Sequence, residues 1–240
     1  MKMRKLKRIT AALALIALML CACIGYADPE DLIGQRISGI HAPYMVEGGL
    51  PSDTDFFTEA DFAESRITVV NFWDSSCMNC RIEMPYFQQA YEIYSQQGAA
   101  FLGVATRWIG GSYVQGWQLL GDLGVTYPSV IVDEGFTQLM EADHGMPYTL
   151  IVDSEGVIID AYRGRLEFEE LEMMILRGLC TPGDVDCDGV VDMSDVSLLF
   201  SYLNGGVNVS KRGLFNADAN GDGSVNVMDI TAIFGIIANS

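Results

Sequence analysis

The sequence predicts an α/β domain followed by a small, purely helical module. Three observations favour this division. Short apolar runs alternate with longer helical segments through most of the chain, one of these runs ends in a Cys-x-x-Cys motif, and two matching acidic loops stand near the C-terminus. Alternation of β-branched runs with helices is typical of an α/β sheet. The length of 240 residues leaves room for one large and one small domain.

The N-terminal segment has the layout of an export leader. Residues 1–8 include five basic side chains, and residues 9–24 are almost wholly apolar. This pattern predicts a signal peptide over residues 1–27 and an extracytoplasmic protein, secreted or associated with a cell-surface scaffold. Residues 20–23 leave an alternative open, because they resemble a lipobox in which Cys23 would carry a lipid. Membrane attachment is expected only in that case, since the apolar run is shorter than the ~20 residues of a membrane span.

The charge of the chain excludes nucleic acid as a partner. Of the 14 basic residues, five lie in the leader, so nine remain against 32 acidic residues and the mature chain carries a formal charge of −23. A surface of this sign repels phosphate and mainly favours solubility.

The α/β domain is predicted over residues 28–179. Residues 67–73 form a β-branched and apolar run, which indicates a buried central strand. The following segments complete the domain: a helix over 81–97 with a kink at Pro85, a strand over 99–106, a helix over 116–123, a strand near 129–133, a strand up to Asp153 that begins at Pro147, a strand over 157–162 after a tight turn, and a closing helix over 166–178.

The Cys-x-x-Cys motif gives this domain its predicted chemistry. Cys77 follows the central strand and would lie at the start of the next helix, where the helix dipole and free N–H groups favour a thiolate. Cys77 is therefore the candidate attacking sulfur, and Cys80 the sulfur that resolves the mixed disulfide in a two-electron exchange. Zinc is disfavoured because the motif supplies two ligands and no histidine lies near it. No organic cofactor is expected.

The order of these segments resembles the thioredoxin fold. The helix inserted at 116–123, together with Arg-Ile-Glu-Met-Pro over 81–85, resembles the TlpA family of extracytoplasmic thiol-disulfide oxidoreductases, over most of residues 35–179. The resemblance implies a central mixed sheet flanked by helices, a cis Pro147 packed against the disulfide, and Glu83 as the proton acceptor for Cys80. An ordinary exposed helix glutamate is the alternative for Glu83. The resemblance also implies a disulfide-containing protein substrate and an external electron donor.

The chain departs from the family pattern around the motif. Ser76 stands where an aromatic residue is common, and the two residues between the cysteines lack the usual proline. Two other functions stay open. A redox-inactive thioredoxin-fold binding module is disfavoured by the intact Cys77, Cys80 and Pro147. A thiol peroxidase needs a threonine and a proline ahead of its reactive cysteine, and residues 74–76 supply neither.

Two acidic loops, 184–195 and 218–229, repeat at an offset of 34 residues. Each has oxygen side chains at loop positions 1, 3, 5, 9 and 12, a glycine at position 6 and a usable carbonyl at position 7, as a cation with six to eight oxygen ligands requires. We therefore predict two calcium ions. Their ligands are Asp184, Asp186, Asp188, Val190, Asp192 and Asp195 in the first loop, and Asp218, Asn220, Asp222, Ser224, Asn226 and Asp229 in the second.

Each loop leads into an apolar helix. Val196, Leu199, Phe200 and Leu203 recur as Ile230, Ile233, Phe234 and Ile237, and this spacing predicts one buried face on each helix. Position 12 is Asp in both loops, whereas the usual EF-hand has the longer Glu there. The Thr181-Pro182-Gly183 segment leaves no room for a helix before the first loop. These features resemble a dockerin over residues 183–240, joined through a linker at 180–182.

The dockerin resemblance implies calcium-dependent docking to a cohesin domain of a scaffold protein. In dockerins, loop positions 10 and 11 contact the cohesin, and these positions are Met193, Ser194, Val227 and Met228 here. Cys180 and Cys187 flank the start of the first loop. Whether they form a disulfide stays open, because the sequence does not give the distance between them.

Overall fold

The computed structural model describes residues 29–139 and 145–240. The predicted leader and the alternative lipid site at Cys23 lie outside the described residues. Within the described part of the chain, no helix combines the length and the apolar character needed to cross a bilayer.

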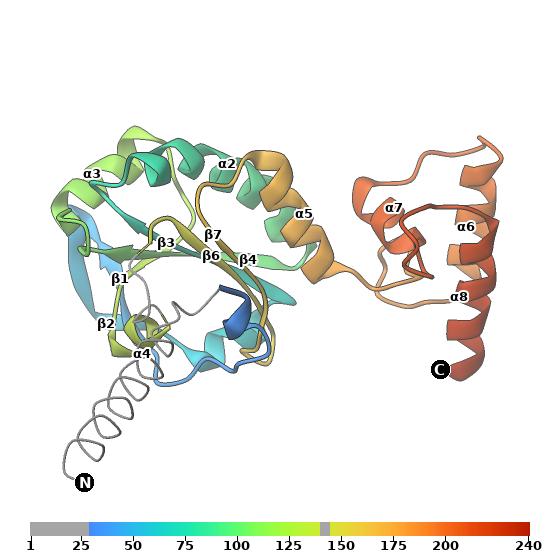
Figure 1. Ribbon diagram of the computed structural model, residues 1–240, viewed down its shortest axis with the longest axis horizontal. Helices are drawn as coiled ribbons and strands as arrows, with labels where there is room; N and C mark the ends of the chain where they lie inside the picture. Colours follow the sequence, from blue (N-terminus) through green and yellow to red (C-terminus); the bar gives the residue numbers. More distant parts are fainter. Residues whose placement is uncertain (1–28, 140–144) are drawn as a thin grey trace, which may run out of the picture.

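A seven-stranded mixed sheet forms the centre of the larger domain (Figure 1). Its strands are β1 (His41–Val46), β2 (Leu50–Thr58), β3 (Ile67–Asp74), β4 (Ala99–Thr106), β5 (Ser129–Ile131), β6 (Tyr148–Asp153) and β7 (Ile158–Arg163), in the spatial order β2-β1-β5-β4-β3-β6-β7. The central strand β3 pairs in parallel with β4 and antiparallel with β6. All eight residues of β3 are buried, which explains why its sequence is apolar on both faces.

Helices cover both faces of this sheet. They are α2 (Met78–Tyr94), α3 (Tyr113–Asp122), α4 (Glu134–Gln138) and α5 (Phe168–Leu179), with short 3-10 helices η1 (Pro29–Leu32), η2 (Glu47–Gly49), η3 (Glu59–Glu64) and η4 (Ser95–Gln97). Figure 1 shows α2, α3 and α5 on one side and α4 on the other. Alternate residues of β3 point to the two layers. Val69 packs with α2 and α5, whereas Val70 and Phe72 pack with Phe62 of η3 and Phe136 of α4. The predicted mixed sheet flanked by helices is confirmed.

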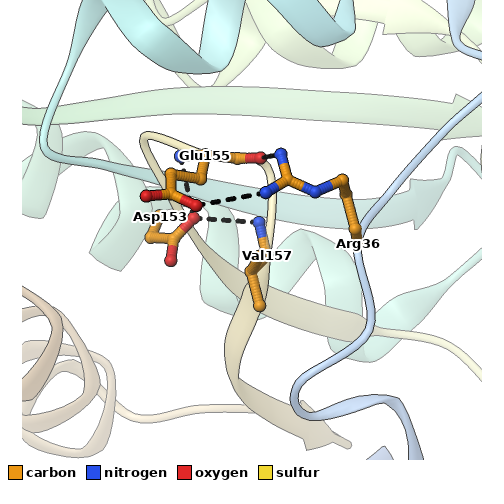
Figure 2. A network of polar contacts seen from close by, with 4 residues as sticks. All are labelled: Arg36, Asp153, Glu155 and Val157. Atoms are coloured by element: carbon orange, nitrogen blue, oxygen red, sulfur yellow. Dashed lines mark hydrogen bonds and ion pairs between the residues drawn. The ribbon is translucent and has the colours of Figure 1, made fainter.

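The turn between β6 and β7 is held by local polar contacts (Figure 2). Asp153 accepts hydrogen bonds from the backbone N–H groups of Glu155 and Val157, each at 2.9 Å. Arg36, from the segment before β1, reaches the carboxylate of Glu155 at 3.1 Å. The segment before β1 is thereby held against the turn between β6 and β7.

Helices α6 (Met193–Leu203), α7 (Lys211–Ala217) and α8 (Val227–Asn239) form the C-terminal module, which joins the larger domain through the end of α5 (Figure 1). Its core contains Val185, Val196, Leu199, Ala217 and Ile233. The prediction of one apolar face is wrong for the two phenylalanines, because Phe200 exposes 60% and Phe234 46% of its surface.

Several elements differ from the predictions: helix α4 was not predicted, and α3 begins three residues before its predicted start. The hairpin β1–β2 was not predicted, because prolines and exposed acids interrupt its apolar alternation. Helix α7, seven residues long, was also missed. Helix α2 begins three residues earlier than predicted and continues through Pro85.

Candidate redox centre and calcium loops

Cys77 and Cys80 form a disulfide at the carboxyl end of β3. Cys77 is the N-cap residue of α2, as the sequence predicts, and its sulfur accepts a hydrogen bond of 3.1 Å from the N–H of Cys80. Cys80 is fully buried, whereas Cys77 keeps 5% of its surface exposed between the exposed Ser76 and Met78. Cys77 is therefore the more accessible of the two cysteines, and it lies at the N-terminus of a helix.

Glu83 lies one turn after Cys80 on α2, so both side chains share one face of the helix. Its carboxylate is fully buried and accepts hydrogen bonds from Asn71 Nδ2 at 2.9 Å and from the N–H of Leu166 at 3.1 Å. Burial raises the pKa of Glu83 to about 7, although the two hydrogen bonds oppose the shift. The alternative of an ordinary exposed glutamate is wrong. A buried carboxyl with this pKa can exchange a proton near neutral pH.

The peptide bond between Met146 and Pro147 is cis, and Pro147 is buried immediately before β6. Met146 packs against the apolar cluster that contains both cysteines and Trp73. Leu119 and Leu120 of α3 belong to the same cluster, so the inserted helix packs on the apolar group that includes both cysteines.

Sequence reasoning missed a polar connection between β3 and the segment before α3. Asp74 is fully buried and accepts hydrogen bonds from the N–H groups of Ser76 at 2.8 Å and Ile109 at 3.2 Å. Ser75 exchanges hydrogen bonds with the backbone of Ser112, the N-cap residue of α3. Asp and Ser before a helix are typical of such turns, and this signal could have indicated that residues 74–76 hold the loop beside the disulfide.

The first acidic loop brings three predicted ligands together. Carboxylate oxygens of Asp184, Asp186 and Asp188 lie within 4.8 Å of one another. Asp184 is fully buried, and neither of its carboxylate oxygens has a hydrogen-bond partner among residues 29–139 and 145–240. Burial and the neighbouring carboxylates raise the pKa of Asp186, while a backbone hydrogen bond opposes the shift. Orphaned oxygens and crowded negative charge fit a bound cation, so the donor set agrees with calcium.

Both loops have the same local construction. Gly189 and Gly223 have φ values of 94° and 84°, which are accessible to glycine and explain its place at position 6. The residue at position 9 caps the following helix: Asp192 accepts from the N–H of Ser194 at 2.6 Å, and Asn226 accepts from that of Met228 at 2.9 Å. Position 12 completes a capping box in both helices, which explains the buried Asp195 and Asp229.

The other predicted ligands make hydrogen bonds within their own loops. Val190 and Ser224 donate their N–H groups to the carboxylate two residues earlier, at 2.8 and 2.9 Å. Asp218 accepts from the N–H groups of Asp222 and Gly223, and the amide of Asn220 donates to Asp222 at 3.1 Å. The second loop differs from the first at position 1, because the carboxylate of Asp218 accepts backbone hydrogen bonds whereas that of Asp184 has no partner among the described residues. It also has amide side chains at positions 3 and 9 in place of two carboxylates.

The four residues predicted to contact a partner are all exposed at the starts of α6 and α8: Met193, Ser194, Val227 and Met228. Cys180 and Cys187 are both free in this structure. Burial raises the pKa of each of these two thiols.

Both domains match known protein families. The Redoxin family matches residues 39–175, and the dockerin type I domain matches residues 182–234. The thiol-disulfide oxidoreductase ResA of Geobacillus kaustophilus is 26% identical over 174 residues, covering 71% of this chain and 95% of the relative. The thiol:disulfide interchange protein HelX of Rhodobacter capsulatus is 31% identical over 140 residues, covering 58% and 74%.

Among solved structures, the thioredoxin domain of a thiol-disulfide oxidoreductase from Bacteroides vulgatus is similar at 19% identity, with a TM-score of 0.48, and the match covers 61% of this chain and 97% of that one. The family match spans more than half of the chain and includes the disulfide and Glu83. The chain therefore belongs to the Redoxin family, as a thiol-disulfide oxidoreductase that carries a C-terminal dockerin type I domain.

Proposed function

We propose that the protein is an exported enzyme that reduces disulfides in proteins while attached to a cohesin-bearing scaffold. The observation that carries the redox proposal is the Cys77–Cys80 disulfide at the start of α2, with the buried Glu83 one turn further along the same helix. We propose domain boundaries at residues 28–179 and 183–240, with 180–182 as the linker.

The proposed reaction begins with the reduced enzyme. The Cys77 thiolate attacks a substrate disulfide, the substrate S–S bond breaks, and one substrate thiolate leaves. Glu83 then takes the proton of the Cys80 thiol, and the Cys80 thiolate attacks the sulfur of Cys77. The mixed disulfide breaks, the second substrate thiolate leaves, and the enzyme holds the Cys77–Cys80 disulfide. Two electrons have moved to the substrate, so an external dithiol donor must reduce the enzyme again.

A reduction assay tests this proposal. The protein should reduce insulin disulfides when a dithiol supplies electrons, and Cys77→Ser should abolish the activity. Cys80→Ser should instead accumulate mixed disulfides, because nothing resolves them. Cys77 should also alkylate with iodoacetamide well below the ~8.5 pKa of a free thiol. Cys180→Ser is the matched control and should retain full activity. Equal alkylation rates at Cys77 and Cys80 would contradict the assignment, and a wild-type protein inactive on insulin would favour a redox-inactive binding module.

The docking proposal uses the dockerin domain. Two calcium ions would be held by loops 184–195 and 218–229, and the orphaned carboxylate of Asp184 is the main support for the first of them. Met193, Ser194, Val227 and Met228 would contact the cohesin, because they are exposed beside the loops. Immobilised cohesin domains should retain the full-length protein in calcium and release it when a chelator is added. Retention that persists in chelator would contradict calcium-dependent docking.

A further inference from the structure

Side chains of helix α7 connect the dockerin domain to the oxidoreductase domain, in addition to the covalent linker. It lies between the two acidic loops in sequence, yet three of its residues contact the oxidoreductase domain. Lys211 donates to the carboxylate of Glu172 on α5. The guanidinium of Arg212 lies 3.3 Å from the carbonyl oxygen of Gln97 and 3.4 Å from that of Leu179. Phe215 packs on the apolar cluster between α2, α5 and the sheet.

The oxidoreductase side of this contact contains a buried acid. Glu172 exposes 6% of its surface and also accepts a hydrogen bond of 2.6 Å from the hydroxyl of Tyr94. Burial acts to raise the pKa of Glu172, but the hydrogen bonds from Lys211 and Tyr94 outweigh it, and the pKa is lowered. A buried carboxylate that loses its cation destabilises the fold. Glu172 therefore depends on a cation that the dockerin domain supplies.

The other end of α7 is fastened to the first acidic loop. Asn216 is fully buried, and its Nδ2 donates to the carbonyl oxygen of Asp184 at 2.7 Å. Its Oδ1 accepts from the N–H of Thr181 at 3.2 Å, and its own carbonyl accepts from the N–H of Gly183 at 2.8 Å. Gly213 allows α7 to pack this closely, because a Cβ there would collide with the carbonyl oxygen of Val185. The backbone at the first predicted calcium ligand and helix α7 therefore form one packed unit.

The linker between the domains is also held. Arg66, immediately before β3, donates through Nη2 to the carbonyl oxygen of Leu179 at 3.1 Å and to the hydroxyl of Thr181 at 2.7 Å. The dockerin domain thus meets the amino end of β3, whereas the disulfide follows its carboxyl end. The eight residues of β3 separate the two places by roughly 25 Å.

We propose that α7 is a clasp between the two domains, formed by Lys211, Arg212, Phe215 and Asn216, and that through it calcium at the first loop stabilises the oxidoreductase domain. This inference rests on the proposed calcium site. A ligand that binds only the folded form of one domain stabilises that domain, and it also stabilises any other domain whose folding is coupled to it. Calcium orders the first loop, the loop holds α7, and α7 supplies the cation for Glu172. The clasp also holds the dockerin domain at the amino end of β3, opposite the end that carries the disulfide.

Hydrogen exchange of the full-length protein tests the clasp. Millimolar calcium, compared with chelator, should slow exchange of α5 amides about tenfold or more in the wild type, as well as that of α6 and α8. In Lys211→Ala/Arg212→Ala, calcium should still protect α6 and α8, which shows that the module folds, but the effect on α5 should be lost. Phe215→Ala should weaken the calcium-dependent protection of α5, because it removes the apolar contact between α7 and the oxidoreductase domain. Arg177→Ala is the matched control, because this α5 cation pairs with Asp160 of β7 instead.

Three outcomes distinguish failure of the clasp from failure of the calcium site. If α6 and α8 respond to calcium but wild-type α5 does not, or if α5 responds equally in the double variant, the clasp is overturned and the calcium site stands. If α6 and α8 show no response to calcium in the wild type, the calcium site is overturned and the clasp proposal fails with it.

Discussion

Glu83 is held in surroundings that favour its protonated form. Its pKa of about 7 lies above the ordinary 4.5, so the folded state keeps a proton that the unfolded state has released. The stability that this proton contributes is fully present below pH ~4.5 and is lost as the pH rises to about 7. The shift corresponds to about 3 kcal/mol. The group proposed to serve the reaction therefore destabilises the fold above neutral pH.

The variant Glu83→Gln should remove this pH dependence. A glutamine stays neutral, so the free energy of unfolding should change less between pH 5 and pH 8 than in the wild type, by about 2.5 kcal/mol. Urea denaturation of the oxidised protein at the two pH values measures this difference. Glu92→Gln, an exposed position on the same helix, is the control and should keep the wild-type dependence. If the free energy of unfolding of Glu83→Gln changed with pH as much as that of the wild type, Glu83 would ionise freely in the folded protein.

At the scale of the element, the loop followed by a helix is the repeating unit of the C-terminal module. The residue at position 9 of each loop is the N-cap of the following helix, and the residue at position 12 is the second member of its capping box. The same side chains therefore belong to the loop and to the first turn of the helix. The same arrangement gathers carboxylates in the first loop, where they repel one another without a cation. Helix formation in α6 and α8 should therefore depend on metal.

Calcium titration tests this dependence in the full-length protein. Adding calcium after chelation should raise the helix content measured by circular dichroism, and calorimetry should give two ions per chain. Asp184→Ala should reduce this number to one, because it removes the buried carboxylate at position 1. Asp53→Ala, at an exposed acid on β2, should leave it at two. No change in helix content up to millimolar calcium would contradict the calcium sites.

At the scale of the whole molecule, the module presents two related but unequal surfaces. Met193 exposes 53% of its surface in the first repeat, and Met228 exposes 59% in the second. The two residues occupy different loop positions, 10 and 11, so the two repeats do not offer the same surface to a cohesin. We therefore expect one preferred docking orientation.

Aspartate substitutions can measure this preference. Met228→Asp should weaken cohesin binding by about 2 kcal/mol or more while Met193→Asp costs little, or the reverse, because a binding hot spot concentrates the energy in few residues. Calorimetry against a panel of cohesins gives the values. Ile93→Asp, at an exposed apolar residue of α2, controls for added charge and should have no effect. Small and equal losses from both methionine changes would favour two binding orientations.

Features that depend on neighbours along the chain could be predicted from the amino-acid sequence. The cysteine motif at the end of an apolar run, the glycine at loop position 6 and the capping oxygens all act within about a turn of their own backbone. Their spacing therefore predicted the disulfide at the start of α2 and both acidic loops. It also predicted the strand 99–106 to the residue.

Features that need residues far apart in the sequence could not be predicted in this way, because they arise when the chain packs. The burial of Glu83 depends on Asn71 from β3 and on the backbone of Leu166 beyond β7. The exposure of Phe200 depends on which face of α6 meets α8. The role of α7 depends on a buried acid 39 residues earlier. Helix periodicity shows that a face is apolar, but only packing shows which residues it covers, because burial is a property of the assembled chain.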